Sequence, residues 1–191
     1  MLKCRNCKVS KFINLFSFGS ISYTGKFPRN NRINIPKAEI KLIMCNNCNL
    51  VQISKNFDLS YMYNNDYGYR TGINHTMSNH IGLLVKKINN IYDLKKGDAV
   101  LDIASNDATL LNAYSSKLIR IGVDPLVKKY KKNYEQIDYK YSSFFRKNLL
   151  NKKILKNKIK IITALSVFYD LKDPNIFLSE IRDIIDTSCG I

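Results

Sequence analysis

Residues 99–111 read AVLDIASNDATLL, and this stretch decides the fold class of the chain. Its first five residues are an apolar run with one acid, Asp102, which predicts a buried β-strand. Small and polar residues then form a turn that leads into a helix expected from about Asn106 to Tyr114. Because the residues of the turn are small, a ligand could approach its backbone closely.

The alternation of strands and helices continues along the rest of the chain. Apolar runs and amphipathic stretches predict strands at residues 119–123, 139–141 and 159–164, and helices at residues 128–134 and 174–185. Such alternation is typical of a mostly parallel α/β sheet. Residues 189–191 look like the start of a fifth strand, so we expect a domain truncated at its C-terminal end.

Candidate ligand-binding residues follow the ends of these strands. Asp124 ends the second strand, about 20 residues after the first turn, where an acid accepts both hydroxyls of an adenosine ribose in nucleotide-binding folds. Phe144 follows the third strand and could stack on an adenine. Ala104 and Ala108 spoil any glycine fingerprint, however. An ordinary parallel sheet with a helix N-cap near Asn106 explains the pattern equally well.

Residues 58–96 differ from the predicted sheet, and we interpret them as a connector followed by a helix. Four tyrosines crowd together in this connector, at Tyr61, Tyr63, Tyr67 and Tyr69. Apolar residues at three-and-four spacing then predict a helix over residues 74–91. The tyrosines either border a substrate or pack between modules, and the pattern favours neither reading.

Four cysteines stand in two pairs ahead of this connector, as Cys4-x-x-Cys7 and Cys45-x-x-Cys48. Two such pairs can present four thiolates to one tetrahedral Zn²⁺ ion, which is the arrangement of a closed structural site. We therefore predict a β-rich zinc-binding module over residues 1–57, too small to be stable without its metal. Redox-active cysteine pairs are the less favoured alternative.

The composition of the 191 residues limits the classes of protein to consider. A hydrophobic content of 45% permits a buried core, and the length leaves room for one ordinary domain and a small one. The fifth cysteine, Cys189, is unpaired in sequence, which argues against a disulfide framework. The N-terminus lacks the apolar run of a signal peptide, and no apolar stretch could span a membrane. We therefore expect a soluble, cytoplasmic protein.

A formal net charge of +16 suggests nucleic-acid binding as one hypothesis, because lysine and arginine neutralise phosphates. The lysines are spread along the chain among asparagines and isoleucines, however, so a specific nucleic-acid site is not expected. The same positive field would attract an acidic small molecule, such as a nucleotide-linked sugar.

Five stretches of the sequence together resemble one family. They are residues 4–7 (CRNC), 45–52 (CNNCNLVQ), 67–72 (YGYRTG), 102–111 (DIASNDATLL) and 163–170 (TALSVFYD). The combination spans nearly the whole chain and resembles the zinc-binding, S-adenosylmethionine-dependent sugar C-methyltransferases. The resemblance implies a zinc module, a tyrosine-rich connector and a Rossmann-like class I methyltransferase domain, the last over residues 97–191. It also implies methylation of a nucleotide-linked keto-sugar, with S-adenosylmethionine and zinc as cofactors.

The resemblance further assigns cofactor-binding roles around the first strand-to-helix turn. It implies that Asp124 binds the ribose and that Asp102 fixes the turn and the methionine end of the cofactor. Asn106 and Asp107, with Ala104, would shape the same pocket. Only the ribose role of Asp124 is also suggested by its place at the end of a strand; the other roles follow from the resemblance alone.

Catalytic roles are fewer. The resemblance implies that Tyr67 and Tyr69 border the active site and that Asp170, in a motif beside the cofactor, is a further catalytic candidate. A turn or helix-cap acid before Pro174 is an equally favoured reading of Asp170. The family's principal catalytic base is expected farther along than this sequence extends. The implied reaction removes a proton beside a ketone, and the resulting enolate attacks the methyl group of the cofactor. The family carries glycines where Ala104 and Ala108 stand, so two added methyl groups would crowd the cofactor.

Two functions from different classes remain open on the sequence. The first is a sugar methyltransferase, present here as its N-terminal portion. The second is a non-catalytic zinc-ribbon binding module, for example for nucleic acid, joined to a degenerate α/β domain. The basic residues are distributed and much of their excess falls in Lys128–Lys160, on expected solvent-exposed segments, which favours the first function.

Overall fold

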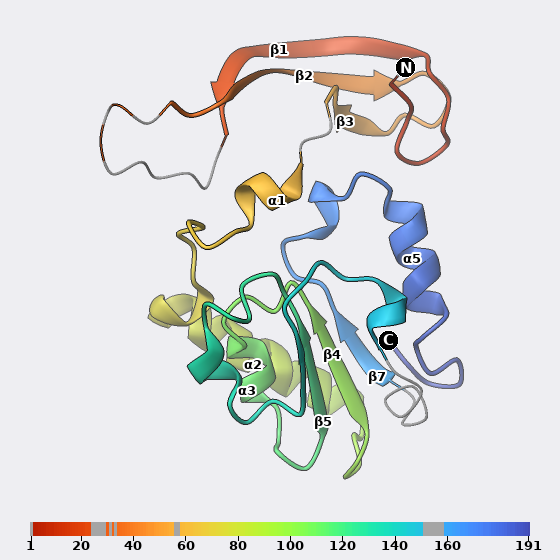
Figure 1. The fold of residues 1–191 in the computed structure, drawn as a ribbon. Coiled ribbons are helices and arrows are strands. Elements are labelled where there is room, and N and C mark those ends of the chain that lie inside the picture. The colour runs from red at the N-terminus through yellow and green to blue at the C-terminus, as the bar shows by residue number, and fades with distance from the viewer. Residues whose placement is uncertain (1, 24–29, 31, 33, 56–57, 151–158) are drawn as a thin grey trace. The chain divides into compact units, whose positions relative to one another are not determined.

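The computed structural model describes residues 2–23, 30, 32, 34–55, 58–150 and 159–191 (Figure 1). The chain forms two compact units. The first comprises Met1–Gly68 and Asp170–Ile176, and the second comprises Tyr69–Tyr169 and Phe177–Ile191. The predicted α/β class is confirmed. The three-part division of the sequence stays a prediction, and its boundary at residue 57 lies outside the described residues.

The first unit is built on an antiparallel sheet with the strand order β1-β2-β3. Its elements are β1 (Phe12–Ser22), β2 (Lys37–Cys45), β3 (Val51–Ile53) and the one-turn helix α1 (Leu59–Met62). Side chains of β1 are exposed along most of its length. By contrast, Ile43, Cys45 and Gln52 share one face of the sheet by register and are buried.

The second unit is built on a parallel sheet with the strand order β6-β5-β4-β7. The strands are β4 (Ala99–Ile103), β5 (Ile119–Val123), β6 (Tyr139–Tyr141) and β7 (Ile159–Thr163). The predicted strands lie where the sequence placed them, with the last one residue shorter. Because the chain adds β5 and β6 on one side of β4 and β7 on the other, the direction of winding reverses at β4.

Helix α2 (His75–Ile91) agrees with the predicted helix and begins after Asn74, whose side chain accepts a hydrogen bond from the backbone of Met77 at 3.1 Å. Three apolar residues of α2 are buried, namely Ile81, Val85 and Ile88. They belong to one core cluster with residues of β4, β7 and helix α3 (Thr109–Ala113). Figure 1 shows α2 and α3 on the same side of the parallel sheet. This cluster is the core of the second unit.

The helix expected over residues 106–114 is shorter than predicted, because α3 begins only at Thr109. The residue before it, Ala108, has a left-handed backbone with φ of 61°, which an α-helix cannot contain. The residues that precede α3 therefore belong to a strained turn and not to the helix.

Two other predicted helices also differ. Residues 128–134 contain only one short helical element, the 3₁₀ turn η2 (Lys131–Tyr134). Four of the five residues 128–132 are lysines, and on an α-helix their like charges would repel one another. Helix α5 (Pro174–Arg182) ends three residues earlier than expected, and Ile185 instead forms a parallel bridge with Ile159 of β7. The remaining 3₁₀ turns are η1 (Thr71–Ile73), η3 (Lys147–Leu149) and η4 (Phe168–Asp170).

Ile191 pairs with β7 on the edge away from β4, beyond the bridge formed by Ile185. Its backbone N–H donates to Lys160 at 2.9 Å, and its carbonyl accepts from Ile162 at 2.8 Å. This pattern is that of a parallel ladder. The expectation of a fifth strand starting at residues 189–191 stays a prediction.

Candidate functional site

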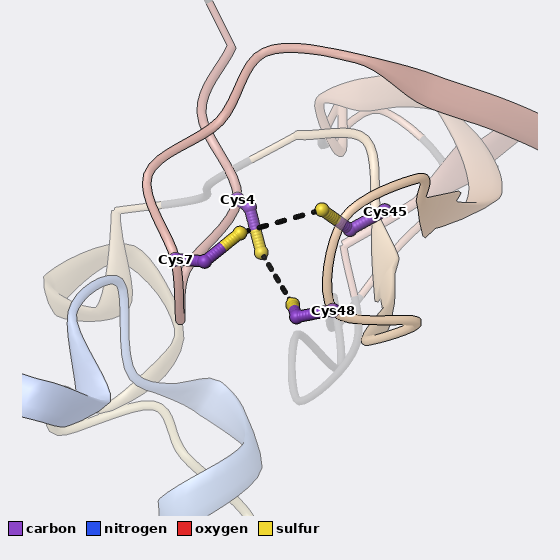
Figure 2. A group of neighbouring side chains, drawn as sticks. All are labelled: Cys4, Cys7, Cys45 and Cys48. Carbon is purple, nitrogen blue, oxygen red and sulfur yellow. Dashed lines mark hydrogen bonds between the residues drawn. The ribbon is translucent and has the colours of Figure 1, made fainter.

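The four cysteines of the predicted zinc module come together in the first unit (Figure 2). All four sulfur atoms lie within 4.8 Å of one another. The Sγ atoms of Cys4 and Cys48 are 3.6 Å apart, and those of Cys7 and Cys45 are 3.5 Å apart. Four thiolates around one Zn²⁺, with Zn–S bonds of about 2.3 Å, stand roughly 3.8 Å from each other. The cluster can therefore hold a metal ion such as zinc.

Both cysteine pairs have the same backbone structure. In each, the N–H of the first cysteine donates to the carbonyl five residues later, and the N–H four residues later donates back to that cysteine. In the first pair, Cys4 donates to Val9 at 2.8 Å and Lys8 donates to Cys4 at 3.1 Å. In the second pair, Cys45 donates to Leu50 at 2.9 Å and Asn49 donates to Cys45 at 3.0 Å. Lys8 and Asn49 also share a left-handed backbone, with φ of 64° and 58°. This shared turn directs the two sulfur atoms of each pair toward the common cluster.

The environments of the thiols differ. Burial raises the pKa of Cys4 to about 11, whereas hydrogen bonding from the backbone of Val9 lowers the pKa of Cys7 to about 6. Because a metal binds the thiolate, occupation of this site displaces protons. All five cysteines are free thiols in the structure, including the exposed Cys189.

In the second unit, the turn between β4 and α3 has an unusual backbone. Ala104, Asn106 and Ala108 all adopt left-handed conformations, with φ of 60°, 47° and 61°. Such a conformation costs an L-residue roughly 1–2 kcal/mol, and glycine avoids this cost. Both alanines that replace glycines of the resembling family therefore occupy positions that suit glycine. Surrounding contacts must hold this turn in place.

Asp124 provides one of these contacts. Its Oδ2 accepts the backbone N–H of Asn106 at 2.9 Å, and its Oδ1 accepts that of Leu126 at 2.7 Å. The side chain is buried, and burial raises its pKa. Asp124 thus fastens the end of β5 to the turn after β4. Each carboxylate oxygen retains a second lone pair, so the group can accept further hydrogen bonds.

Tyr134 and Ser105 form a second contact, which sequence reasoning missed. The Tyr134 hydroxyl donates to the carbonyl of Asn106 at 2.9 Å and lies 2.7 Å from Ser105 Oγ. Tyr134 is fully buried, and its ring passes so close to Gly122 that a Cβ there would lie 2.8 Å from Cε1. The signal in the sequence was Gly122, a glycine inside a strand, which marks a close approach by another group.

Asp102 lies at the carboxyl end of β4 and is buried. Its Oδ1 accepts a hydrogen bond of 2.6 Å from the Thr163 hydroxyl on β7. Burial raises the pKa of Asp102 to about 7, with a smaller contribution from the charge of Asp124. Near neutral pH the side chain therefore exists in both its neutral and its charged form.

Asp107 is completely buried beside the last residues of the tyrosine-rich connector. Its Oδ2 accepts from Arg70 Nε at 2.9 Å and from the backbone N–H of Gly72 at 3.0 Å. Its Oδ1 accepts from Thr109 Oγ1 at 2.5 Å. The carboxylate thus joins the connector to the start of α3.

Asn106 holds the same segment. Its Oδ1 accepts from the backbone N–H of Thr71 at 2.9 Å, and its Nδ2 donates to the carbonyl of Tyr69 at 3.3 Å. The Tyr130 hydroxyl donates to the same carbonyl at 3.4 Å. The structure therefore places the side chains of Asn106 and Asp107 against the chain at residues 69–72. The assignment of these two residues to a cofactor pocket stays a prediction.

The remaining predicted site residues fall in both units. In the first, the Tyr63 hydroxyl donates to Asp170 Oδ2 at 2.6 Å, and the Tyr63 ring lies 4.9 Å from that of Tyr67. Tyr67 and Asp170 therefore share Tyr63 as a neighbour. In the second unit, the side chains of Tyr69 and Phe144 are exposed. The catalytic and adenine-stacking roles of these residues stay predictions.

No protein-family model matches the chain, and no curated protein matches it. Within the described part of the chain, no helix is both long enough and apolar enough to cross a membrane. The function must therefore be inferred from the cysteine cluster and from the turn between β4 and α3.

Proposed function

We propose that the chain is an S-adenosylmethionine-dependent methyltransferase that carries one structural zinc ion. The observation that carries this proposal is the left-handed backbone at Ala104 and Ala108. Both positions match glycines of the resembling family, and a left-handed turn is what those glycines would supply. The left-handed backbone that those glycines would supply is thus present although the glycines are not.

The topology of the parallel sheet supports a nucleotide-like ligand at this turn. If the four strands are numbered along the chain from β4 as 1 to β7 as 4, their order across the sheet is 3-2-1-4. Doubly wound sheets have the same order in their first part. Such sheets bind ligands outside the carboxyl ends of their strands, where the winding reverses. Here that position is the end of β4, where Asp102 and the left-handed turn lie.

Asp124 suits recognition of ribose hydroxyls. It stands at the carboxyl end of β5 with both oxygens bonded to backbone N–H groups, which fixes the direction of the remaining lone pairs. The bound S-adenosylmethionine would supply an activated methyl group. The residues of this chain would bind and orient it, with Asp102 held at the carboxyl end of β4 by its hydrogen bond from Thr163 on β7.

A nucleotide-linked keto-sugar is the proposed substrate. Its negative charge suits a chain with a formal net charge of +16. The cysteine cluster would serve structure and not chemistry, because four thiolates fill the tetrahedral coordination of zinc and leave no position for a substrate.

The proposal is tested by calorimetric titration of S-adenosylhomocysteine into the zinc-loaded chain. We expect wild-type protein to bind and Asp124→Ala to bind roughly tenfold to a hundredfold more weakly, because a charged acceptor contributes about 1.5–3 kcal/mol. Asp138→Ala is the matched control. Asp138 also accepts a backbone N–H, from Arg120 at 2.9 Å, but it precedes β6 at the opposite end of the sheet.

The Asp138→Ala variant should bind as wild type does. Absence of binding by the folded wild-type chain would overturn the proposed function. Equal affinity of the Asp124→Ala and Asp138→Ala variants would remove the ribose role of Asp124 and leave the function in place.

A further inference from the structure

Residues 69–73, which we name the strap, cross the turn between β4 and α3 and are bonded to it at several points. Asn106 bonds the backbone of Tyr69 and Thr71, and Asp107 bonds the backbone of Gly72 and the side chain of Arg70. The two consecutive side chains that follow Ser105 are thus both committed to the strap.

Arg70 is the charged partner of this arrangement. Its Nε lies 2.9 Å from Oδ2 of Asp107, a carboxylate with no exposed surface. The guanidinium also lies over the ring of Tyr130, 5.4 Å from its centroid, and Nη2 donates to Asn133 Oδ1 at 3.3 Å. A buried carboxylate that loses its cation is strongly destabilised. Three groups therefore hold Arg70 in one orientation over Asp107.

Gly72 lets the strap approach the turn closely. A Cβ at this position would lie 2.7 Å from Oδ2 of Asp107 and 2.8 Å from Oγ1 of Thr109, closer than non-bonded atoms approach. The strap can therefore lie this close to the turn only because residue 72 has no side chain.

From these contacts we infer that the strap holds the turn in its left-handed shape, and that Arg70 is a positioning residue for the ligand bound there. A backbone in sparsely populated conformations persists only where its surroundings determine it. Asp124 restrains the backbone N–H of Asn106, and the strap restrains the side chains of Asn106 and Asp107. The identity of the ligand, S-adenosylmethionine or its demethylated product, rests on the proposed function.

The first arm of the test measures hydrogen exchange of backbone amides in the zinc-loaded chain without ligand. The amides of Thr71, Gly72 and Asn106 report directly, because the bonds described above protect them. Arg70→Gln should accelerate their exchange about tenfold, and Arg70→Lys should accelerate it less because the positive charge remains. Arg182→Gln, an equal charge change at the exposed end of α5, should leave the three amides unchanged.

The second arm measures the affinity for S-adenosylhomocysteine. Arg70→Gln should weaken binding about tenfold, Arg70→Lys should restore part of it, and Arg182→Gln should bind as wild type does. The double variant Arg70→Gln/Asp107→Asn removes both charges, so no buried unpaired carboxylate destabilises its fold. It should remain weak in binding, which separates positioning of the ligand from loss of folded protein.

The outcomes separate this inference from the proposed function. Equal affinities of the Arg70→Gln and Arg182→Gln variants would overturn the positioning role, as would unchanged exchange at the three amides. If wild-type protein does not bind S-adenosylhomocysteine, the proposed function fails, and the exchange arm alone then decides whether the strap holds the turn.

Discussion

The two units bury very different amounts of apolar surface. Among the described residues of the first unit, only Cys4, Ala38, Ile43 and Cys45 are buried apolar groups, and two of these four belong to the cysteine cluster. The second unit buries a continuous cluster that joins α2, α3 and the parallel sheet. The first unit has little apolar core of its own, so we expect a metal ion held by the cysteine cluster to stabilise it, whereas the second unit is held by its own core.

Removal of the metal should have the largest effect and tests this contrast directly. We expect one zinc ion per chain, and we expect Cys45→Ser to lose both the ion and the structure of the first unit. Structural zinc sites contribute roughly 10–16 kcal/mol of apparent binding free energy, which is then lost to folding. Metal analysis and amide NMR spectra check both points, with Cys189→Ser as a control that keeps its zinc.

The signals of core residues of the second unit, such as Val100 and Leu111, should be unchanged in the Cys45→Ser variant. Reductively purified protein without stoichiometric zinc would contradict the prediction. A first unit that stays folded without metal would contradict it equally.

The second unit should instead respond to pH through Asp102. Its folded-state pKa of about 7 lies above its ordinary value of 3.8, because burial disfavours the charge. Between these values the folded chain keeps a proton that the unfolded chain has lost. The free energy of unfolding should therefore fall as the pH rises from about 4 to about 7 and level off above that range.

Asp102→Asn cannot ionise and still accepts the hydrogen bond from Thr163. Its stability relative to wild type should rise across the same pH range, by on the order of a few kcal/mol. Urea unfolding of both proteins at several pH values measures the difference. A difference that stays constant with pH would show that Asp102 does not carry the effect.

Packing within the second unit is tested by Gly122→Ala. The added methyl group would lie 2.8 Å from Tyr134 Cε1 and 3.0 Å from Leu111 Cδ1, so we expect a loss of roughly 1–3 kcal/mol of stability. Gly82→Ala makes the same change in α2, where nothing beyond the adjacent residues and the backbone of the helix itself lies within 4 Å of the new Cβ. It should stabilise the chain by about 0.5–1 kcal/mol. The midpoint temperature of thermal unfolding should therefore fall in the Gly122→Ala variant and rise in the Gly82→Ala variant.

The smallest effect concerns the left-handed turn. Ala104→Gly and Ala108→Gly should each stabilise the chain by about 1 kcal/mol, because glycine adopts a positive φ without strain. Ala113→Gly, in the helical α3, should destabilise it. Denaturant unfolding of the three variants distinguishes these signs. A loss of stability in the Ala104→Gly and Ala108→Gly variants would show that the turn is not strained.

The sequence predicted the strands of the second unit well, because buried parallel strands are short apolar runs with clear ends. The bounds of β4, β5 and β6 agree with the predicted ranges. The ends of α3 and α5 were wrong. A left-handed Ala108 and the pairing of Ile185 with β7 depend on tertiary contacts that no local pattern contains.

The candidate site was predictable to a similar degree. The spacing of the cysteines was sufficient to predict their cluster, because each pair forms a local turn. The partners of Asn106 and Asp107 were not predictable, since these side chains meet residues 35 to 37 positions earlier in the chain. Such contacts follow from the fold and not from neighbouring residues.

The first unit is not one continuous stretch of chain, and this has a practical consequence for dissecting the molecule. Within that unit, Lys8 forms an ion pair with Asp173 at 2.6 Å, Asn175 donates to the carbonyl of Asn6, and Tyr63 bonds Asp170. A fragment that stops at Gly68 would lack all three partners. The first unit contains Asp170–Ile176, which lie between the two segments of the second unit, so neither a single proteolytic cut nor a simple truncation yields the first unit by itself.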